Sequence, residues 1–243
     1  MDPILTRRMA VAAISALTLA TAPLALAQSD SAASETHDHD HDHDHDHDHD
    51  HDHDHDHHDH EHDHAKDIYA GYFDDDQIKD RPLSDWEGDW QSVYPYLLDG
   101  TLDEVFAHKA EQSDDKTAEE YKAYYEIGYE TDVDRIVIDG STVSFHEDGQ
   151  VLSGEYASDG YEVLTYKAGN RGVRYIFEYQ GEDDSLPNYI QFSDHAIYPT
   201  EADHYHLYWG DDRAALLEEV TNWPTYYPSE LDGQGVVDEM LAH

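Results

Sequence analysis

This chain contains a series of short segments in which apolar and polar residues alternate, and these segments end at turns containing glycine. Alternation with period two places one face of a strand in a core and the other in water. Asp-Gly pairs such as Asp139-Gly140 and Asp148-Gly149 favour tight turns between antiparallel strands. We expect strands over residues 135–138, 142–146, 151–156, 161–166, 173–179, 188–193 and 205–209.

A meander of at least seven strands predicts a mainly β fold, namely an antiparallel barrel that is closed or nearly closed. Closure is favoured because it removes the exposed edges of a sheet. A few short helices should accompany the barrel. Thr117 to Glu120 form a capping box that predicts a helix ending near Gly128, and Ser84 to Glu87 have the same form. The other expected elements are a strand over 91–98 and helices over 102–111, 213–221 and 236–242, the last two joined by a link over 222–228.

Composition divides the chain of 243 residues into three segments. Residues 1–27 resemble a signal peptide, because Arg7 and Arg8 precede a long apolar run that ends in a small-residue cleavage site. Residues 28–64 are of low complexity and contain too few apolar residues to fold alone. Residues 65–243 are rich in tyrosine, tryptophan and branched aliphatic side chains, as expected of one globular domain.

We therefore expect a soluble protein exported to the periplasm, with no membrane insertion after signal cleavage. The alternative is that the apolar run stays as a membrane anchor, and the choice between the Sec and twin-arginine routes is open. The chain has no cysteine, so we do not expect a lipoprotein, and any metal site must use His, Asp or Glu. A net charge of −44 argues against nucleic acid and anionic membranes as partners and favours cations.

The most unusual run is residues 37–64, which consist of 15 His, 12 Asp and one Glu. Neutral imidazole is a good ligand for Zn(II), and carboxylate is a second type. Strict alternation provides many overlapping sites without fixed geometry, so we expect several weakly held, exchangeable ions. Because imidazole also suits Ni(II), Cu(II) and Co(II), selectivity should be poor. The auxiliary ligands nearest the domain are His58, His60, His62 and His64.

A second candidate site lies within the domain. His204 and His206 are two residues apart on an expected strand, so their side chains should point to the same face. His195 follows the preceding strand, and the turn around Pro199 can bring it beside them. Three imidazoles leave one position of a tetrahedral zinc shell open.

Three other interpretations stay open at this point. A zinc hydrolase can use the same ligand set, with Asp194 or Asp203 as supporting groups, although no proton-transfer partner is evident, so we do not expect an enzyme. A barrel of this size can also hold a small apolar ligand. Finally, a metal buffer or detoxifier without a delivery partner would carry the same ligands.

Several segments of the domain resemble the ZinT family of bacterial periplasmic zinc-binding proteins, also called YodA. They are Phe73 to Asp75, Leu83 to Pro95, Gly172 to Tyr175, Tyr189 to His195, His204 to His206 and Asn222 to Pro228.

The resemblance implies a calycin-like barrel related to the lipocalins, whose Gly-x-Trp motif is similar to Gly88-Asp89-Trp90. It also implies that His195, His204 and His206 bind Zn(II) or Cd(II), and that an N-terminal histidine or a small ligand completes the shell. The family recruits zinc and hands it to the solute-binding protein of a zinc ABC importer, which is the partner we expect for this chain. We expect the protein itself to be a monomer.

Overall fold

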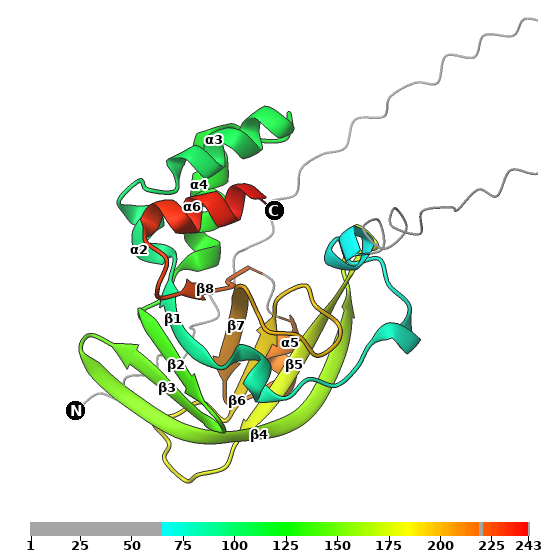
Figure 1. Cartoon of the computed structure of the whole chain (residues 1–243), viewed down its shortest axis with the longest axis vertical. Helices are drawn as coiled ribbons and strands as arrows, with labels where there is room; N and C mark the ends of the chain where they lie inside the picture. The colour runs from blue at the N-terminus through cyan, green and yellow to red at the C-terminus, as the bar shows by residue number, and fades with distance from the viewer. Residues whose placement is uncertain (1–64, 219–220, 243) are drawn as a thin grey trace, which may run out of the picture. The chain divides into compact units, whose positions relative to one another are not determined.

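The computed structural model describes residues 65–218 and 221–242. Its sheet is a closed antiparallel barrel of eight strands, in which each strand pairs with the next and the last pairs with the first (Figure 1). The strands are β1 (Gly88–Ser92), β2 (Arg135–Asp139), β3 (Thr142–Glu147), β4 (Gln150–Thr165), β5 (Arg171–Tyr179), β6 (Tyr189–Ser193), β7 (Tyr205–Gly210) and β8 (Thr225–Pro228). The predicted fold class, a mainly β antiparallel barrel with a few short helices, is confirmed.

The three longest of the described helices lie between β1 and β2 or after β8. They are η1 (Asp75–Gln77), η2 (Leu83–Trp86), α2 (Tyr94–Leu98), α3 (Asp103–Gln112), α4 (Ala118–Tyr129), α5 (Arg213–Glu218) and α6 (Gly233–Ala242), and residues 65–69 are also helical. The predicted capping box of α4 is present, with Glu120 N–H donating to Thr117 Oγ1 and Thr117 N–H donating to Glu120 Oε2. The predicted box at Ser84 is wrong, because the chain there forms the short 3-10 helix η2 without a side-chain cap.

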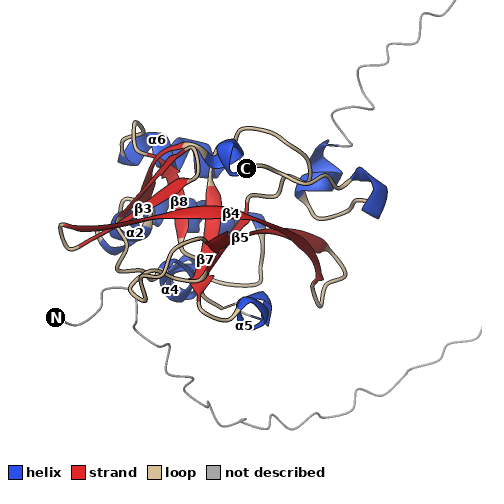
Figure 2. Ribbon diagram, turned by 90° about the horizontal axis from the view of Figure 1, so that it is seen from below, coloured by secondary structure: helices blue, strands red, loops and turns tan. Residues whose placement is uncertain are grey.

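Three other sequence predictions differ from the structure. The two strands expected on either side of Asp159-Gly160 are one long strand, β4, because Gly160 (φ +80°) absorbs a bulge between Ser158 and Tyr161 instead of a hairpin turn. Figure 2 shows this strand crossing the width of the sheet. The strand expected over 91–98 ends at Ser92, since Pro95 at the start of α2 favours a helix there.

The third difference concerns the strand that closes the barrel. Residues 222–228, expected to be a link, contain β8, which pairs with both β1 and β7. The Asn222 side chain donates hydrogen bonds to the carbonyls of Gly128 and Glu130 at the end of α4. Trp223 packs so closely on Gly128 that a Cβ there would lie 2.3 Å from its ring. These contacts set where β8 begins and therefore where Thr225 and Tyr227 lie.

Two apolar cores follow from this arrangement. The barrel encloses one core around Trp86, Trp90 and Phe192, which are all nearly inaccessible to solvent. The second core joins α2, α3, α4 and α6 through residues such as Leu97 and Phe106. Figure 1 shows these helices gathered beside β1 and β8. No helix in the described ranges is sufficiently long and apolar to cross a bilayer.

Candidate metal centre

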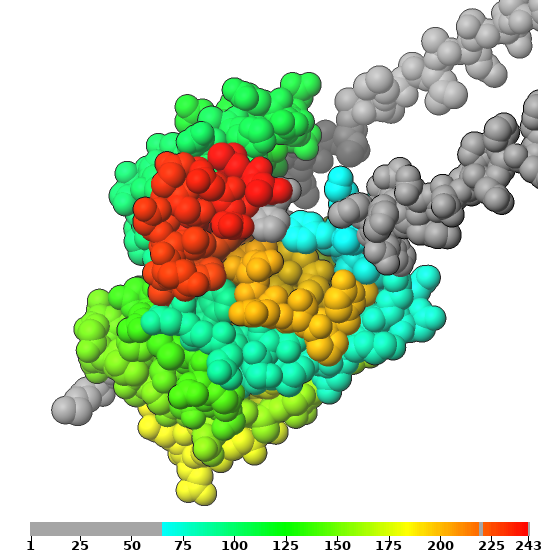
Figure 3. Space-filling view, viewed as in Figure 1, coloured from blue at the N-terminus to red at the C-terminus, as the bar shows by residue number. Residues whose placement is uncertain are grey.

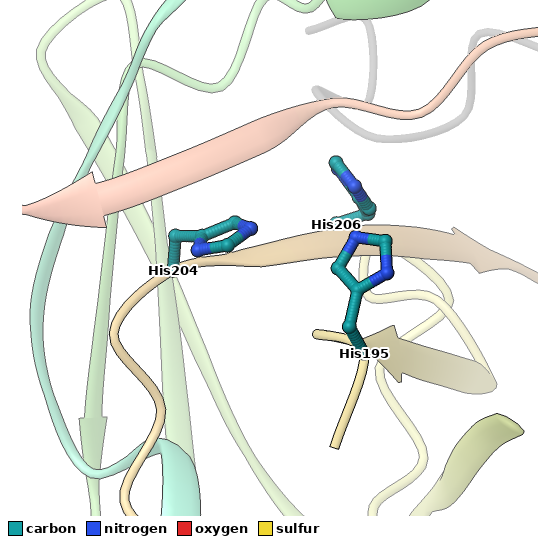
Figure 4. Close-up of side chains that lie close together, drawn as sticks. All are labelled: His195, His204 and His206. Atoms are coloured by element: carbon teal, nitrogen blue, oxygen red, sulfur yellow. The ribbon is translucent and has the colours of Figure 1, made fainter. Parts of the chain in front are cut away.

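The structure brings together His195, His204 and His206, the three domain histidines singled out in the sequence. One ring nitrogen from each lies within 4.8 Å of those of the other two. Figure 4 shows the rings turned toward one shared space, two from β7 and its approach and one from the segment after β6. Two nitrogens bound to one tetrahedral Zn(II) are about 3.3 Å apart, given Zn–N bonds of about 2.0–2.1 Å. Small side-chain rotations therefore suffice to close the cluster around an ion.

His206 is held in the tautomer that a metal ligand needs. Its Nδ1 lies 2.7 Å from Thr225 Oγ1 on the neighbouring strand, with which it is paired in register. The Thr225 hydroxyl donates its own hydrogen to the carbonyl of Trp223 at 2.9 Å. Thr225 Oγ1 must therefore accept from Nδ1–H of His206, which leaves the Nε2 lone pair for an ion.

His204 is buried and stacked on Tyr227. The two rings are 5.0 Å apart and within 9° of parallel, and only 7% of His204 is exposed. Tyr227 comes from β8, so this one strand supports from the side both His206 on β7 and His204, which directly precedes β7. Neither Thr225 nor Tyr227 was expected to support the site, because their segment was interpreted as a link.

His195 is exposed and has a backbone conformation that side-chain-bearing residues rarely adopt, with φ at +67°. Tyr69 stacks on its ring at 4.4 Å. The preceding residue, Asp194, accepts the N–H of Ala196 at 3.2 Å, so its side chain spans the turn at His195. Such strained conformations persist only where surrounding contacts enforce them.

Those contacts come from Arg81, whose side chain is fully buried. Its Nη1 donates to both carboxylate oxygens of Asp194, at 2.6 and 2.8 Å, and its Nε donates to Asp85 at 2.8 Å. The guanidinium also packs over the Trp86 ring at 4.1 Å. Asp194 therefore supports the site by anchoring the His195 turn to the barrel core.

Asp194→Asn tests this role. The substitution keeps the shape but removes the charge facing Arg81, so we expect roughly a tenfold loss of Zn(II) affinity, the lower end of the effect of disturbing groups behind metal ligands. Competition with a fluorescent chelator measures the affinity, and circular dichroism checks the fold. Asp159→Asn, which loses an exposed pair with Arg213 in the same way, is the control. Equal zinc affinities for the two variants would contradict the anchoring role.

Burial of the His206 ring lowers its pKa well below the ordinary value, and the neighbouring His195, His204 and Arg174 add to the effect. A lowered pKa keeps the imidazole neutral, which is the form that binds metal, to a lower pH. His206 is therefore prepared to bind an ion under conditions that protonate an exposed histidine.

The tail histidines His58, His60, His62 and His64, with the rest of residues 37–64, lie outside the described residues. The described chain starts at Ala65, which lines a cleft of about 210 Å³ together with His195 and His204. Figure 3 shows the cyan start of the domain beside the orange segment that leads into β7. The first described residue therefore lies beside the histidine cluster.

A lipocalin-like antiparallel barrel with three imidazoles gathered where β6, β7 and β8 meet defines a metal-binding barrel protein. The family model of the ZinT (YodA) periplasmic lipocalin-like zinc-recruitment proteins matches residues 64–243. The chain belongs to the ZinT (YodA) family, as the resemblance predicted. This is a family of zinc-binding proteins and not of enzymes.

Individual relatives agree with this assignment. A Bacillus subtilis (strain 168) protein named "Probable metal-binding protein YrpE" is 68% identical over 176 residues, which cover 72% of this chain and 70% of YrpE. The zinc-binding lipoprotein AdcA of Streptococcus pneumoniae serotype 4 is 50% identical over 180 residues, 74% of this chain but only 36% of AdcA. The crystal structure of the Zn(II)-bound ZinT-like domain of Streptococcus pneumoniae AdcA matches with a TM-score of 0.70 and 49% identity, covering 72% of this chain and 97% of that domain.

Proposed function

We propose that this protein captures Zn(II) outside the cytoplasm with His195, His204 and His206 as its defined site, and that it contributes to zinc uptake. The observation that carries the proposal is the convergence of three imidazoles, with one coordination position left over, on the barrel of a zinc-recruitment family. The match to a Zn(II)-bound AdcA domain supports zinc as the ion. We propose that the same three imidazoles also bind Cd(II).

We assign a different role to each of the three segments of the chain. Residues 1–27 direct export and are removed, residues 28–64 collect ions loosely, and residues 65–243 hold one ion firmly. The histidine-rich run can extend up to about 90 Å at roughly 3.3 Å per residue, and it is tethered beside the cluster. Tethering raises the effective concentration of tail-bound ions at the defined site.

As the pH falls, the tail should lose its metal ions before the domain does. An unperturbed imidazole is half-protonated near pH 6.5, while the lowered pKa of His206 keeps that ligand neutral below this value. We therefore expect the tail to release most of its ions by about pH 6 while the domain retains one. Equilibrium dialysis at several pH values measures this for the full chain and for His206→Ala. If the full chain and His206→Ala release their zinc over the same pH range, the domain has no preorganised site.

Delivery to the solute-binding protein of a zinc ABC importer completes the proposal. In AdcA, a zinc-binding protein, the matched ZinT-like domain occupies about a third of the chain, which supports the idea that such a domain works together with a partner. We propose binding and not catalysis, because Asp194, the acidic neighbour of His195, is committed to Arg81 and so does not serve as a proton-transfer group.

A transfer experiment tests delivery. The protein is first loaded with one equivalent of Zn(II). In one arrangement a dialysis membrane separates it from the importer's solute-binding protein, and in the other the two proteins are mixed directly. Delivery predicts transfer that is faster when the two proteins are in contact than when zinc must diffuse between them. Equal rates in the two arrangements would indicate a buffer that only releases zinc. Comparison with His206→Ala separates transfer from the tail and transfer from the domain.

A further inference from the structure

The first described residues of the domain pass directly beside the histidine cluster. Residues 65–70, which we call the gate, consist of one short helix over 65–69 and a turn at Ala70. The ring of Tyr69 in the gate stacks on the ring of His195, with their centres 4.4 Å apart and their planes within 25° of parallel. Figure 3 shows this part of the chain, in cyan, at the surface of the domain. The gate therefore covers the most exposed of the three histidines.

The gate separates two cavities that both reach the histidines. The larger, of about 720 Å³, lies between the barrel and the helical layer and is lined by all three histidines. The smaller, of about 210 Å³, is lined mostly by the gate and by residues 194–204. Both cavities are lined by Ile68, Tyr69, His195 and His204, so these residues form the wall between them. Moving the gate away would join the two cavities and open the cluster from a second side.

The gate is tied to the barrel at one end, by Gly71. This residue has φ at +88°, which residues with a side chain rarely adopt, and its carbonyl accepts the N–H of Arg171 at 2.8 Å. A Cβ at Gly71 would lie 2.4 Å from the carbonyl oxygen of Arg171, where β5 begins. Arg171 Nη1 also donates to the carbonyl of Phe73 at 2.8 Å. The chain is therefore fixed from Phe73 onward, and Gly71 is the point about which the gate can turn.

The gate itself is held by few contacts. Five of its six residues are exposed, and only Ile68 is partly buried against the barrel core. The hydrogen bond from the N–H of Ala70 to the carbonyl of Lys66, at 2.9 Å, lies within the gate and does not fasten it to the barrel. Helices this short are unstable alone, and segments with few buried apolar contacts open at low cost in free energy. The stack of Tyr69 on His195 is therefore one of the main contacts that keep the gate closed.

We propose that residues 65–70 open and close about Gly71 and so set how fast zinc enters and leaves the three histidines, with Tyr69 as the latch on His195. This inference rests on the proposed function, since it concerns exchange of the ion at that site. A latch that holds equally in the metal-free and the zinc-bound protein slows entry and exit by the same factor, because both pass through the open state. It therefore changes the rates and leaves Kd unchanged, whereas loss of a group that only positions His195 changes Kd.

Replacing Tyr69 by alanine tests the latch. The full-length protein is loaded with one equivalent of Zn(II) and mixed in a stopped-flow instrument with an excess of a chelator that changes colour when it binds zinc. We expect release from Tyr69→Ala to be roughly threefold to tenfold faster than from the wild type, which is what the loss of one aromatic stack corresponds to. Competition titration should show that Kd changes by less than about twofold.

Three further variants identify the moving part. Tyr69→Phe keeps the stacked ring and should release zinc at close to the wild-type rate. Gly71→Ala should displace the gate, because its new Cβ meets the backbone of β5, and should speed release by a similar factor, with circular dichroism to check the fold. The double variant Tyr69→Ala/Gly71→Ala should be no faster than the faster single variant, since both changes open the same gate. The matched control is Tyr72→Ala, which removes an exposed tyrosine that lines neither of these two cavities, and it should behave as the wild type.

The outcomes separate the inference from the proposed function. An unchanged release rate in Tyr69→Ala would overturn the gate, and so would a faster release matched by an equal rise in Kd, because Tyr69 would then only position His195. Equally fast release from Tyr72→Ala would assign the effect to general loosening of the segment and also overturn it. All three results leave a tight zinc site in place. If the wild type holds no zinc more tightly than His206→Ala does, the proposed function itself fails.

Discussion

Replacing His206 by alanine is expected to abolish tight zinc binding by the domain. A structural zinc site is worth about 10–16 kcal/mol, so one ligand of four contributes roughly 3 kcal/mol, or about a hundredfold in Kd. The loss of zinc affinity should lie at the upper end of this range, because the hydrogen bond to Thr225 already holds His206 in the tautomer that binds metal. The lowered pKa of His206 also favours its neutral ring. Competition titration against a strong chelator, which removes tail-bound ions first, measures the affinity of the remaining site.

His108→Ala is the matched control for this variant. His108 is exposed on α3 and is not part of the histidine cluster. Removing it takes away the same side chain without changing the proposed ligands, so its zinc affinity should equal that of the wild type. If zinc affinity falls a hundredfold in both variants, or in neither, the assignment of His206 as a ligand is refuted.

Deleting residues 37–64 is expected to lower the number of bound zinc ions sharply and to leave one tightly bound ion. The deleted run has 15 imidazoles, enough for about four ions if each takes three or four donors. The domain cluster draws all three of its histidines from residues 195–206, so its ligands survive the deletion. Elemental analysis after dialysis gives the stoichiometry, and chelator competition gives the affinity.

A length-matched variant, in which every histidine of 37–64 is replaced by asparagine, controls for the loss of chain and of carboxylates. Both proteins should retain one tight ion. If the tight ion disappears from both, a tail histidine is an essential ligand and the division between collecting tail and defined site is wrong. If only the deletion loses it, the tail carboxylates contribute to the tight site.

Much of the fold could be predicted because its signals are local. The hairpin from β2 to β3 and the cap of α4 each depend on residues a few positions apart, and both are as expected. The errors occurred where distant contacts override local chemistry. Asp159-Gly160 has the composition of a turn, yet β5 pairs with the residues on both sides of it and makes them one strand.

The candidate ligands were predictable for a similar reason. The spacing of His204 and His206 puts both rings on one face of an extended segment, although β7 itself begins only at Tyr205. Their supporting groups were not predictable from spacing. Thr225 and Tyr227 reach the site only because β8 closes the barrel, and Arg81 meets Asp194 across 113 positions of sequence.

The chemistry available to this protein therefore follows from its residue types and their local order: imidazole and carboxylate ligands, no thiolate, alternating strands and two histidines on one face at the start of one of them. These are properties of residue types and of short-range spacing, which the backbone geometry converts directly into position. Long-range packing, by contrast, determines that His195 joins the pair, which tautomer His206 adopts and which cavity the three rings face. Those outcomes depend on closing the barrel and packing the helices against it, and contacts between such distant residues leave no periodic signal in the chain.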